Sequence, residues 1–168
     1  MNIKQLKNLF LSQSYLDTIR DYEHFLNNEQ ESWDYFVLTA SNESQARTYR
    51  NEIELRKQEH SIPLNCEYVV LADPDGKRVG SGGATLNVLN YIASKNDNSA
   101  QPFKNKKVLI IHSGGDSKRV PQYSVCGKLF SPVPRETATG KSSTLFDEFM
   151  IVMSSVARRI NEGMLVLS

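Results

Sequence analysis

Cysteine is scarce in this sequence, which has only Cys66 and Cys126 among its 168 residues. The two cysteines lie far apart, and neither stands in a CxxC pair or beside a histidine, so the pattern supports neither a zinc site nor a disulfide framework. We expect both thiols to be reduced and free of metal.

An excess of one charge is also missing. Twenty Lys and Arg residues stand against nineteen Asp and Glu residues, the net charge is +1, and no polybasic run is present. Sequence-independent binding of nucleic acid depends on such basic patches. We therefore expect no nucleic-acid partner.

Long apolar runs are absent too. A membrane helix needs about 18 consecutive apolar residues, whereas runs such as Val108–Ile111 are short. The start of the chain carries Lys4 and Lys7, but no apolar stretch with a signal-peptide cleavage site follows them. With 39% apolar and 23% charged residues, the composition is typical of a globular protein. We expect it to be cytoplasmic and to have no membrane partner.

Four short apolar runs have the length and the β-branched or aromatic content of buried strands. These runs are Trp33–Ala40, Cys66–Ala72, Lys107–Ile111 and Met164–Ser168. Because they alternate with helical patterns, they predict an α/β fold with a mostly parallel sheet and flanking helices, in which ligands bind at the carboxyl ends of the strands. The last run stands at the end of the chain, so we expect the fold to be incomplete at its C-terminus.

Helical patterns fill the intervals between these runs. In the first thirty residues the apolar pattern is interrupted at Ser12–Ser14, which predicts two amphipathic helices. We expect residues 1–30 to form a helical segment ahead of a domain over residues 31–168. The other helices are predicted from a cap within Ser41–Ser44 to about His60, along a stripe of Leu86, Leu89 and Ala93 flanked by Val88 and Ile92, and from Leu145 to Ile160.

A glycine-rich segment, His112 to Lys128, follows the third predicted strand and begins a long segment with Gly, Ser and Pro residues that reaches Gly140. Adjacent glycines let backbone N–H groups approach a phosphate closely. Basic side chains supply full positive charge for a triphosphate and for a leaving pyrophosphate. We assign nucleotide binding to Ser113, Gly114, Gly115, Asp116 and Ser117, and catalysis to Arg119 and Lys128. A surface loop with solvated charges is the competing interpretation.

A second glycine-rich segment, Gly80–Thr85, opens the predicted helix that follows it. N–H groups at the start of a helix favour an anion, which makes Gly82 and Gly83 candidates for nucleotide binding. A tight connection explains these glycines equally well. A dinucleotide-binding fingerprint is disfavoured because Thr85 holds its last glycine position and because Asp73–Gly76, which comes before, has the composition of a turn.

Three further features are interpreted as structural. His112 stands at a strand end, where a histidine can reach a ligand, but we give it no catalytic role. Asp73 and Asp75 are interpreted as turn residues rather than a metal pair. Gly140-Lys141-Ser142 lacks the first glycine and the strand of a P-loop and predicts a helix-capping turn instead. No metal ligand is assigned within the chain.

The loop residues carry a resemblance to a known family. Sugar-1-phosphate nucleotidyltransferases have a GGxGxR loop followed by a lysine, and Gly114, Gly115, Arg119 and Lys128 match that pattern. Ser117 replaces the third glycine, and a glycine precedes the lysine where proline is usual. This variant resembles fucose-1-phosphate guanylyltransferases, which read HSGG, then an arginine followed by a hydrophobic residue and proline, then Gly-Lys. Further similar segments are Trp33–Ala40, Asp73-Pro74, Gly80–Leu86 and Phe130–Pro134.

The resemblance implies a Rossmann-like nucleotidyltransferase fold and the formation of GDP-fucose and pyrophosphate from GTP and fucose 1-phosphate. It favours a role for Gly82 and Gly83 in the guanine-nucleotide pocket, and it implies Mg²⁺ in the complete enzyme. In the family the metal-binding aspartate follows a strand like Met164–Ser168, so we expect this chain to be inactive alone. Two alternatives stay open: a bifunctional protein with a C-terminal fucokinase domain, and a nucleotide-binding domain without chemistry.

Overall fold

Four parallel strands form the central sheet of the computed structural model, which describes residues 2–27, 29, 31–96, 100–113, 127–137 and 140–168. The strands are β1 (Tyr35–Ala40), β2 (Glu67–Ala72), β3 (Lys107–His112) and β6 (Gly163–Leu167), in the order β2-β1-β3-β6. Every neighbouring pair is parallel. The four predicted strands and the Rossmann-like α/β fold with a mostly parallel sheet are confirmed.

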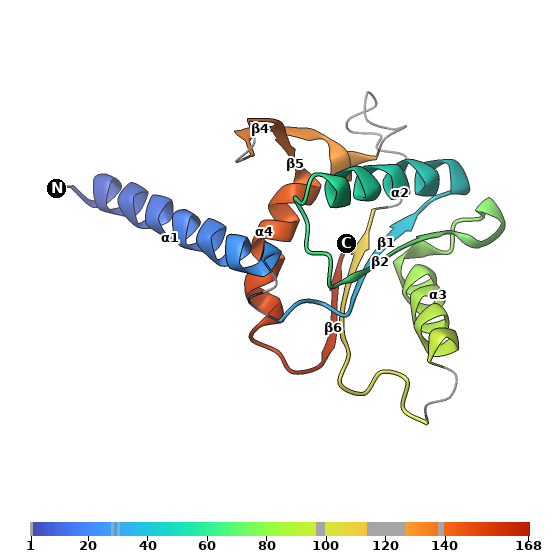
Figure 1. Ribbon diagram of the computed structural model, residues 1–168. Coiled ribbons are helices and arrows are strands. Elements are labelled where there is room, and N and C mark those ends of the chain that lie inside the picture. The colour runs from blue at the N-terminus through green and yellow to red at the C-terminus, as the bar shows by residue number, and fades with distance from the viewer. Residues whose placement is uncertain (1, 28, 30, 97–99, 114–126, 138–139) are drawn as a thin grey trace.

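Helices cover both faces of this sheet (Figure 1). The helices α2 (Glu43–Gln58) and α4 (Leu145–Ala157) pack on one face, and α3 (Gly80–Lys95) packs on the other. Successive side chains of a strand point to opposite faces. Phe36 and Leu38 of β1 therefore join the core beneath α2 and α4, whereas Tyr35 and Val37 join the core beneath α3. Burial on both faces explains why β1 is an almost unbroken apolar run.

The buried face of α3 differs from the predicted stripe. The helix buries Ala84, Val88 and Ile92, which recur every four residues, whereas Leu86 is 63% exposed. Leu86 lies two positions from Val88 and so roughly 200° around the helix from it. The prediction that Leu86 belongs to the buried stripe is wrong.

A single helix, α1 (Ile3–Leu26), replaces the two helices predicted near the N-terminus. Asn2 caps it in a reciprocal arrangement with Gln5, and the serines at 12 and 14 lie within it as exposed residues. The sequence predicts a break because the apolar residues of the two halves lie on different faces of one continuous helix. Leu6 and Tyr22, for example, are roughly 160° apart around the helix axis. A serine hydroxyl disturbs a helix when it hydrogen-bonds to backbone groups in place of the helical bonds. An exposed serine can point its hydroxyl to solvent instead.

The two halves of α1 have different surroundings. Tyr22 and Phe25 in the C-terminal half are buried in the core that α4 also lines, whereas the N-terminal half projects away from the sheet (Figure 1). In the part of the chain that the structure describes, no helix is both long and apolar enough to cross a membrane.

A two-stranded hairpin lies between the main sheet's third strand and α4. After the short helix η3 (Lys128–Phe130), β4 (Pro132–Glu136) pairs antiparallel with β5 (Ser142–Thr144). Neither strand of this hairpin is among the four strands that the sequence predicts. Thr144, in a capping box with Asp147, caps α4, so Gly140-Lys141-Ser142 leads into β5 and is not the helix cap that the sequence predicts.

Candidate functional site

The path of the chain through the sheet creates a crevice at one edge. From β1 the chain passes through α2 to β2, and it then passes through α3, on the opposite face, to β3 on the other side of β1. Crossovers that leave a strand in opposite directions open a crevice at the carboxyl ends of the two strands, where open α/β sheets bind ligands. The topology therefore points to the carboxyl ends of β1 and β3.

A cavity of about 300 Å³ lies at this edge of the sheet. Its walls come from the ends of the strands and from the start of α3, and most of the residues that line it have polar side chains. The residues that line it are Thr39, Ser41, Asp73, Arg78, Gly80, Ser81, Ala84, His112 and Ser168. We call it the strand-end cavity.

The His112 side chain connects three elements in the wall of the strand-end cavity. Its Nδ1 lies 3.0 Å from the hydroxyl of Thr39 on β1, and its Nε2 lies 2.9 Å from the hydroxyl of Thr85 on α3. The Thr85 hydroxyl donates its hydrogen to the carbonyl of Ser81, so it accepts from His112. This network assigns the proton to Nε2 in the neutral ring and leaves Nδ1 to accept from Thr39.

The electrostatics of His112 keep its ring neutral. Burial lowers its pKa from the ordinary value of 6.5, and the carboxylate of Asp73 opposes this shift only in part. The structural role that the sequence predicts for His112 is confirmed, because both ring nitrogens bond to threonines. Thr39 and Thr85 escaped the sequence reasoning because a threonine in a strand or helix carries no functional pattern.

The predicted phosphate loop is described only at its two ends. Ser113 follows β3 and bonds to the hydroxyl of Tyr49 on α2. Lys128 begins η3 and is exposed, whereas the next two residues, Leu129 and Phe130, are buried. The other predicted residues, Gly114, Gly115, Asp116, Ser117 and Arg119, lie outside the described residues.

Gly82 and Gly83 occupy the first turn of α3. The residue before the helix, Val79, makes no side-chain hydrogen bond to cap it, so the first-turn N–H groups rely on other partners for neutralisation. A side chain at Gly83 would place its Cβ 2.7 Å from the Cβ of Val79, whereas Gly82 has open space around it. The tight connection therefore accounts for Gly83, and anion binding by this turn stays a prediction.

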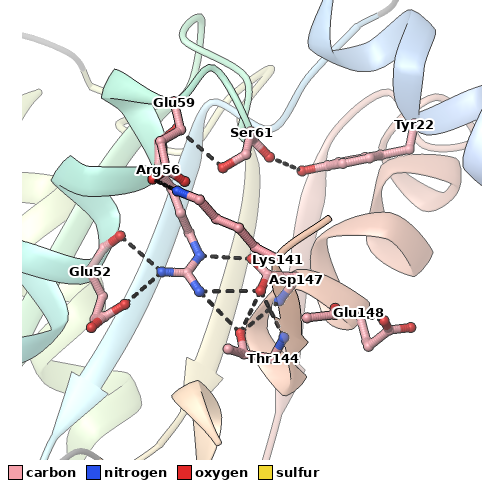
Figure 2. Close-up of polar contacts among 10 residues, drawn as sticks. Tyr22, Glu52, Arg56, Glu59, Ser61, Lys141, Thr144, Asp147 and Glu148 are labelled. Atoms are coloured by element: carbon pink, nitrogen blue, oxygen red, sulfur yellow. Dashed lines mark hydrogen bonds and ion pairs between the residues drawn. The ribbon is translucent and has the colours of Figure 1, made fainter. Parts of the chain in front are cut away.

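A larger cavity, of about 570 Å³, lies among α1, α2, α4 and the β4–β5 hairpin. Figure 2 shows the polar network in its wall, centred on Arg56. In the described part of the chain its three Arg and Lys residues all have carboxylate partners: Arg56 bonds Asp147 and Glu52, Arg135 bonds Glu148, and Lys141 bonds Glu59. Cations that are already neutralised offer little attraction to a phosphate, so this cavity is not the candidate site.

Metal-ligating side chains are sparse at the strand-end cavity. Asp73 is the one carboxylate among the described residues that line it. Asp73 and Asp75 lie at the turn η1 (Pro74–Gly76), as the sequence predicts. Over the described residues no three His, Cys, Asp or Glu side chains group to hold a metal ion.

Comparison with known proteins agrees with the sequence resemblance. Residues 100–168 match the model of the fucose pyrophosphorylase domain. The fucose-1-phosphate guanylyltransferase of Mus musculus is 36% identical over 104 residues, which cover 62% of this chain and 17% of the mouse protein. The Homo sapiens protein of the same name is 35% identical over the same share of each chain.

A plant relative matches a longer part of the chain. The bifunctional fucokinase/GDP-fucose pyrophosphorylase of Arabidopsis thaliana is 35% identical over 143 residues, which cover 73% of this chain and 14% of the plant protein. The chain thus spans 17% or less of the length of these three curated relatives. No solved structure matches it. The predicted resemblance to fucose-1-phosphate guanylyltransferases is confirmed.

Proposed function

We propose that this chain is part of a sugar-1-phosphate nucleotidyltransferase that forms GDP-fucose and pyrophosphate from GTP and fucose 1-phosphate. The observation that carries the proposal is where the family match falls. Residues 100–168 contain β3, the predicted phosphate loop, Lys128 and β6. The segment similar to guanylyltransferases thus includes the strand end that borders the crevice of the sheet.

The proposed reaction transfers a guanylyl group. A phosphate oxygen of fucose 1-phosphate attacks the α-phosphorus of GTP, the bond from that phosphorus to the bridging oxygen of the β-phosphate breaks, and pyrophosphate leaves with the bonding electron pair. Such a transfer needs in-line positioning and neutralisation of phosphate charge more than covalent help. Lys128 and Arg119 would supply that charge, and backbone N–H groups of Gly114, Gly115 and Asp116 would hold the phosphates.

The described wall of the strand-end cavity suits a binding role with little covalent chemistry. His112 bonds to both Thr39 and Thr85, and a neutral His112 adds no charge that would compete with Lys128 for phosphate. We infer that these residues hold the end of β3 against α3 and so fix the direction in which the loop leaves the sheet.

Mg²⁺ is part of the proposal for the complete enzyme, in which it would neutralise phosphate charge. The described residues do not form a site for it, since Asp73 is the one carboxylate among them at the strand-end cavity. No step of the proposed reaction is therefore derived through a metal held by these residues.

A second activity in the same polypeptide is also proposed. The Arabidopsis relative and a Bacteroides fragilis relative, which is 34% identical over 71 residues, are named as both fucokinase and guanylyltransferase or pyrophosphorylase. We propose that the residues of this chain serve the nucleotidyl transfer and that a kinase domain, where present, lies C-terminal to them. A cytoplasmic location, which the sequence predicts, completes the proposal.

The direct experiment is to incubate the full-length protein with GTP, fucose 1-phosphate and Mg²⁺ and to measure GDP-fucose by chromatography. ATP, CTP and UTP in place of GTP test the base, and omission of the sugar phosphate is the blank. Formation of GDP-fucose supports the proposal. Binding of GTP without any product would favour the nucleotide-binding domain without chemistry.

A further inference from the structure

Tyr49 places a buried hydroxyl at the start of the predicted phosphate loop. The residue lies on α2 with no exposed surface, and its ring packs against Phe130 at 5.3 Å between ring centroids. Its hydroxyl lies 3.2 Å from the Ser113 carbonyl oxygen, to which it donates, and 2.6 Å from the Ser113 side-chain oxygen, from which it accepts. Both of these hydrogen bonds therefore go to the residue that follows β3.

The same hydroxyl lies against the other end of the loop. A Cβ built on Gly127 would fall 1.9 Å from the Tyr49 hydroxyl oxygen and 2.8 Å from the ring carbon that bears it. Gly127 also has a φ of +73°, which side chains rarely tolerate. Only glycine meets both demands, so the backbone just before Lys128 lies directly on Tyr49.

The burial of the Tyr49 hydroxyl strengthens its hold on Ser113. A buried hydroxyl without a partner costs free energy, so the two bonds to Ser113 hold the start of the loop firmly to α2. Phe130, two residues after Lys128, stacks at 5.1 Å on Phe146 of α4. The end of the loop is thus anchored on the same face of the sheet as its start.

We propose that Tyr49 is a positioning residue for the nucleotidyl transfer: its hydroxyl sets the separation between Ser113 and Gly127 and so fixes where the ammonium group of Lys128 lies relative to the end of β3. This inference rests on the proposed function. Tyr49 touches no reacting atom and acts through the two residues that it holds.

The test is Tyr49→Phe in the full-length protein. This substitution keeps the ring that packs on Phe130 and removes only the hydroxyl. Tyr22→Phe is the matched control, because Tyr22 is also buried and donates its hydroxyl to a backbone carbonyl, that of Ser61, at 2.6 Å. Tyr68→Phe, which removes a hydroxyl bonded to the Pro63 carbonyl at 3.0 Å, is a second control.

We expect Tyr49→Phe to lower kcat/KM for GTP by about ten-fold, because hydrogen bonds that align a substrate are lost. The KM for GTP should rise and kcat should fall, whereas the KM for the sugar phosphate should not change. Tyr22→Phe and Tyr68→Phe should stay within about two-fold of the wild type. Ser113→Ala removes only the bond from the Ser113 side chain and keeps the bond to its carbonyl, so its loss should be smaller. The double variant should be little worse than Tyr49→Phe, because Tyr49→Phe already removes both bonds. A Tyr49→Phe enzyme that matches the Tyr22→Phe control overturns the inference.

A measurement without activity separates this inference from the proposed function. Hydrogen–deuterium exchange of the full-length protein reports the Ser131 amide, which bonds the Lys128 carbonyl at 3.0 Å. Tyr49→Phe should speed exchange over residues 127–131 several-fold, and Tyr22→Phe should not. If the wild type formed no GDP-fucose, the proposed function would fail. The exchange rates of Tyr49→Phe would still test whether the Tyr49 hydroxyl holds residues 127–131 in place. Unchanged exchange would refute the positioning role even in an active enzyme.

Discussion

Arg56 carries the most enclosed charge network among the described residues. Its guanidinium bonds both carboxylate oxygens of Asp147, at 2.7 and 3.2 Å, and also reaches Glu52 and Thr144 (Figure 2). Burial on its own would raise the pKa of Asp147, but hydrogen bonds from Arg56 and Thr144 outweigh it and hold that pKa below its usual value. The network joins α2 to the first turn of α4 and so fixes the two helices that carry Tyr49 and support Phe130.

Loss of Arg56 should be costly because Asp147 would stay buried without its partner. We expect Arg56→Met to lower the free energy of unfolding by about 3 kcal/mol or more, measured by urea denaturation. Arg20→Met, which removes the exposed ion pair with Asp17 at 3.9 Å, should cost less than about 1 kcal/mol. An equal loss in the free energy of unfolding for the two variants would show that the buried Arg56–Asp147 pair stabilises the fold no more than the exposed pair does.

His112 should make stability depend on pH. Its folded-state pKa is below the ordinary 6.5, so the unfolded chain takes up the proton first as the pH falls. Stability should therefore be constant above about pH 7, fall as the pH drops below about 6.5, and level off below the folded-state pKa. Denaturation midpoints from pH 8 to pH 5 measure this, and His112→Gln should flatten that part of the profile. An unchanged slope in His112→Gln would contradict the assignment.

At the scale of the element, α1 shows how one helix can be half anchored. Phe25 is 1% exposed in the core, whereas Phe10, on the same helix, is 71% exposed. The buried residues Tyr22 and Phe25 belong to the C-terminal half, which lies against α4. Helices derive most of their stability from such packing.

These two phenylalanines give a matched pair of substitutions. Phe25→Ala should lower the free energy of unfolding by about 3–5 kcal/mol, because it empties a core position. Phe10→Ala should change it by less than about 0.5 kcal/mol, because an exposed substitution leaves no cavity. Chemical denaturation measures both. A large loss from Phe10→Ala would mean that the N-terminal half of α1 is packed in solution.

Elements were predictable where one physical signal dominated. β1 and β3 are apolar because both faces are covered, and Asn42, within the predicted Ser41–Ser44, caps α2. β4 escaped prediction because Pro132 and Pro134 disfavour a strand, although a two-stranded hairpin tolerates them. The continuity of α1 also escaped, because exposed serines and a change of apolar face resemble a break between two helices.

At the scale of the whole molecule, the sheet brings together residues that are distant in sequence. Thr39 meets His112, and Tyr49 meets Ser113, only because β3 pairs with β1 and α2 returns over them. The glycine and lysine pattern after a strand is local, so the prediction of a phosphate site could be made from the sequence, and it stays a prediction. The tyrosine and threonines that hold that region could not be predicted, because their roles arise from contacts across the fold.

The proposed nucleotidyl transfer depends on Lys128, the predicted catalytic residue that the structure describes. It is exposed beside the buried anchor of Leu129 and Phe130, so its loss should remove charge without disturbing the core. Lys104 is also exposed and has no assigned role, which makes Lys104→Ala the matched control.

The decisive measurement is the rate of GDP-fucose formation from GTP and fucose 1-phosphate by the full-length Lys128→Ala protein, with unfolding midpoints recorded alongside. We predict a fall in kcat of about 100-fold or more, an unchanged midpoint, and near wild-type turnover in Lys104→Ala. Turnover within about two-fold of the wild type in Lys128→Ala would contradict this prediction.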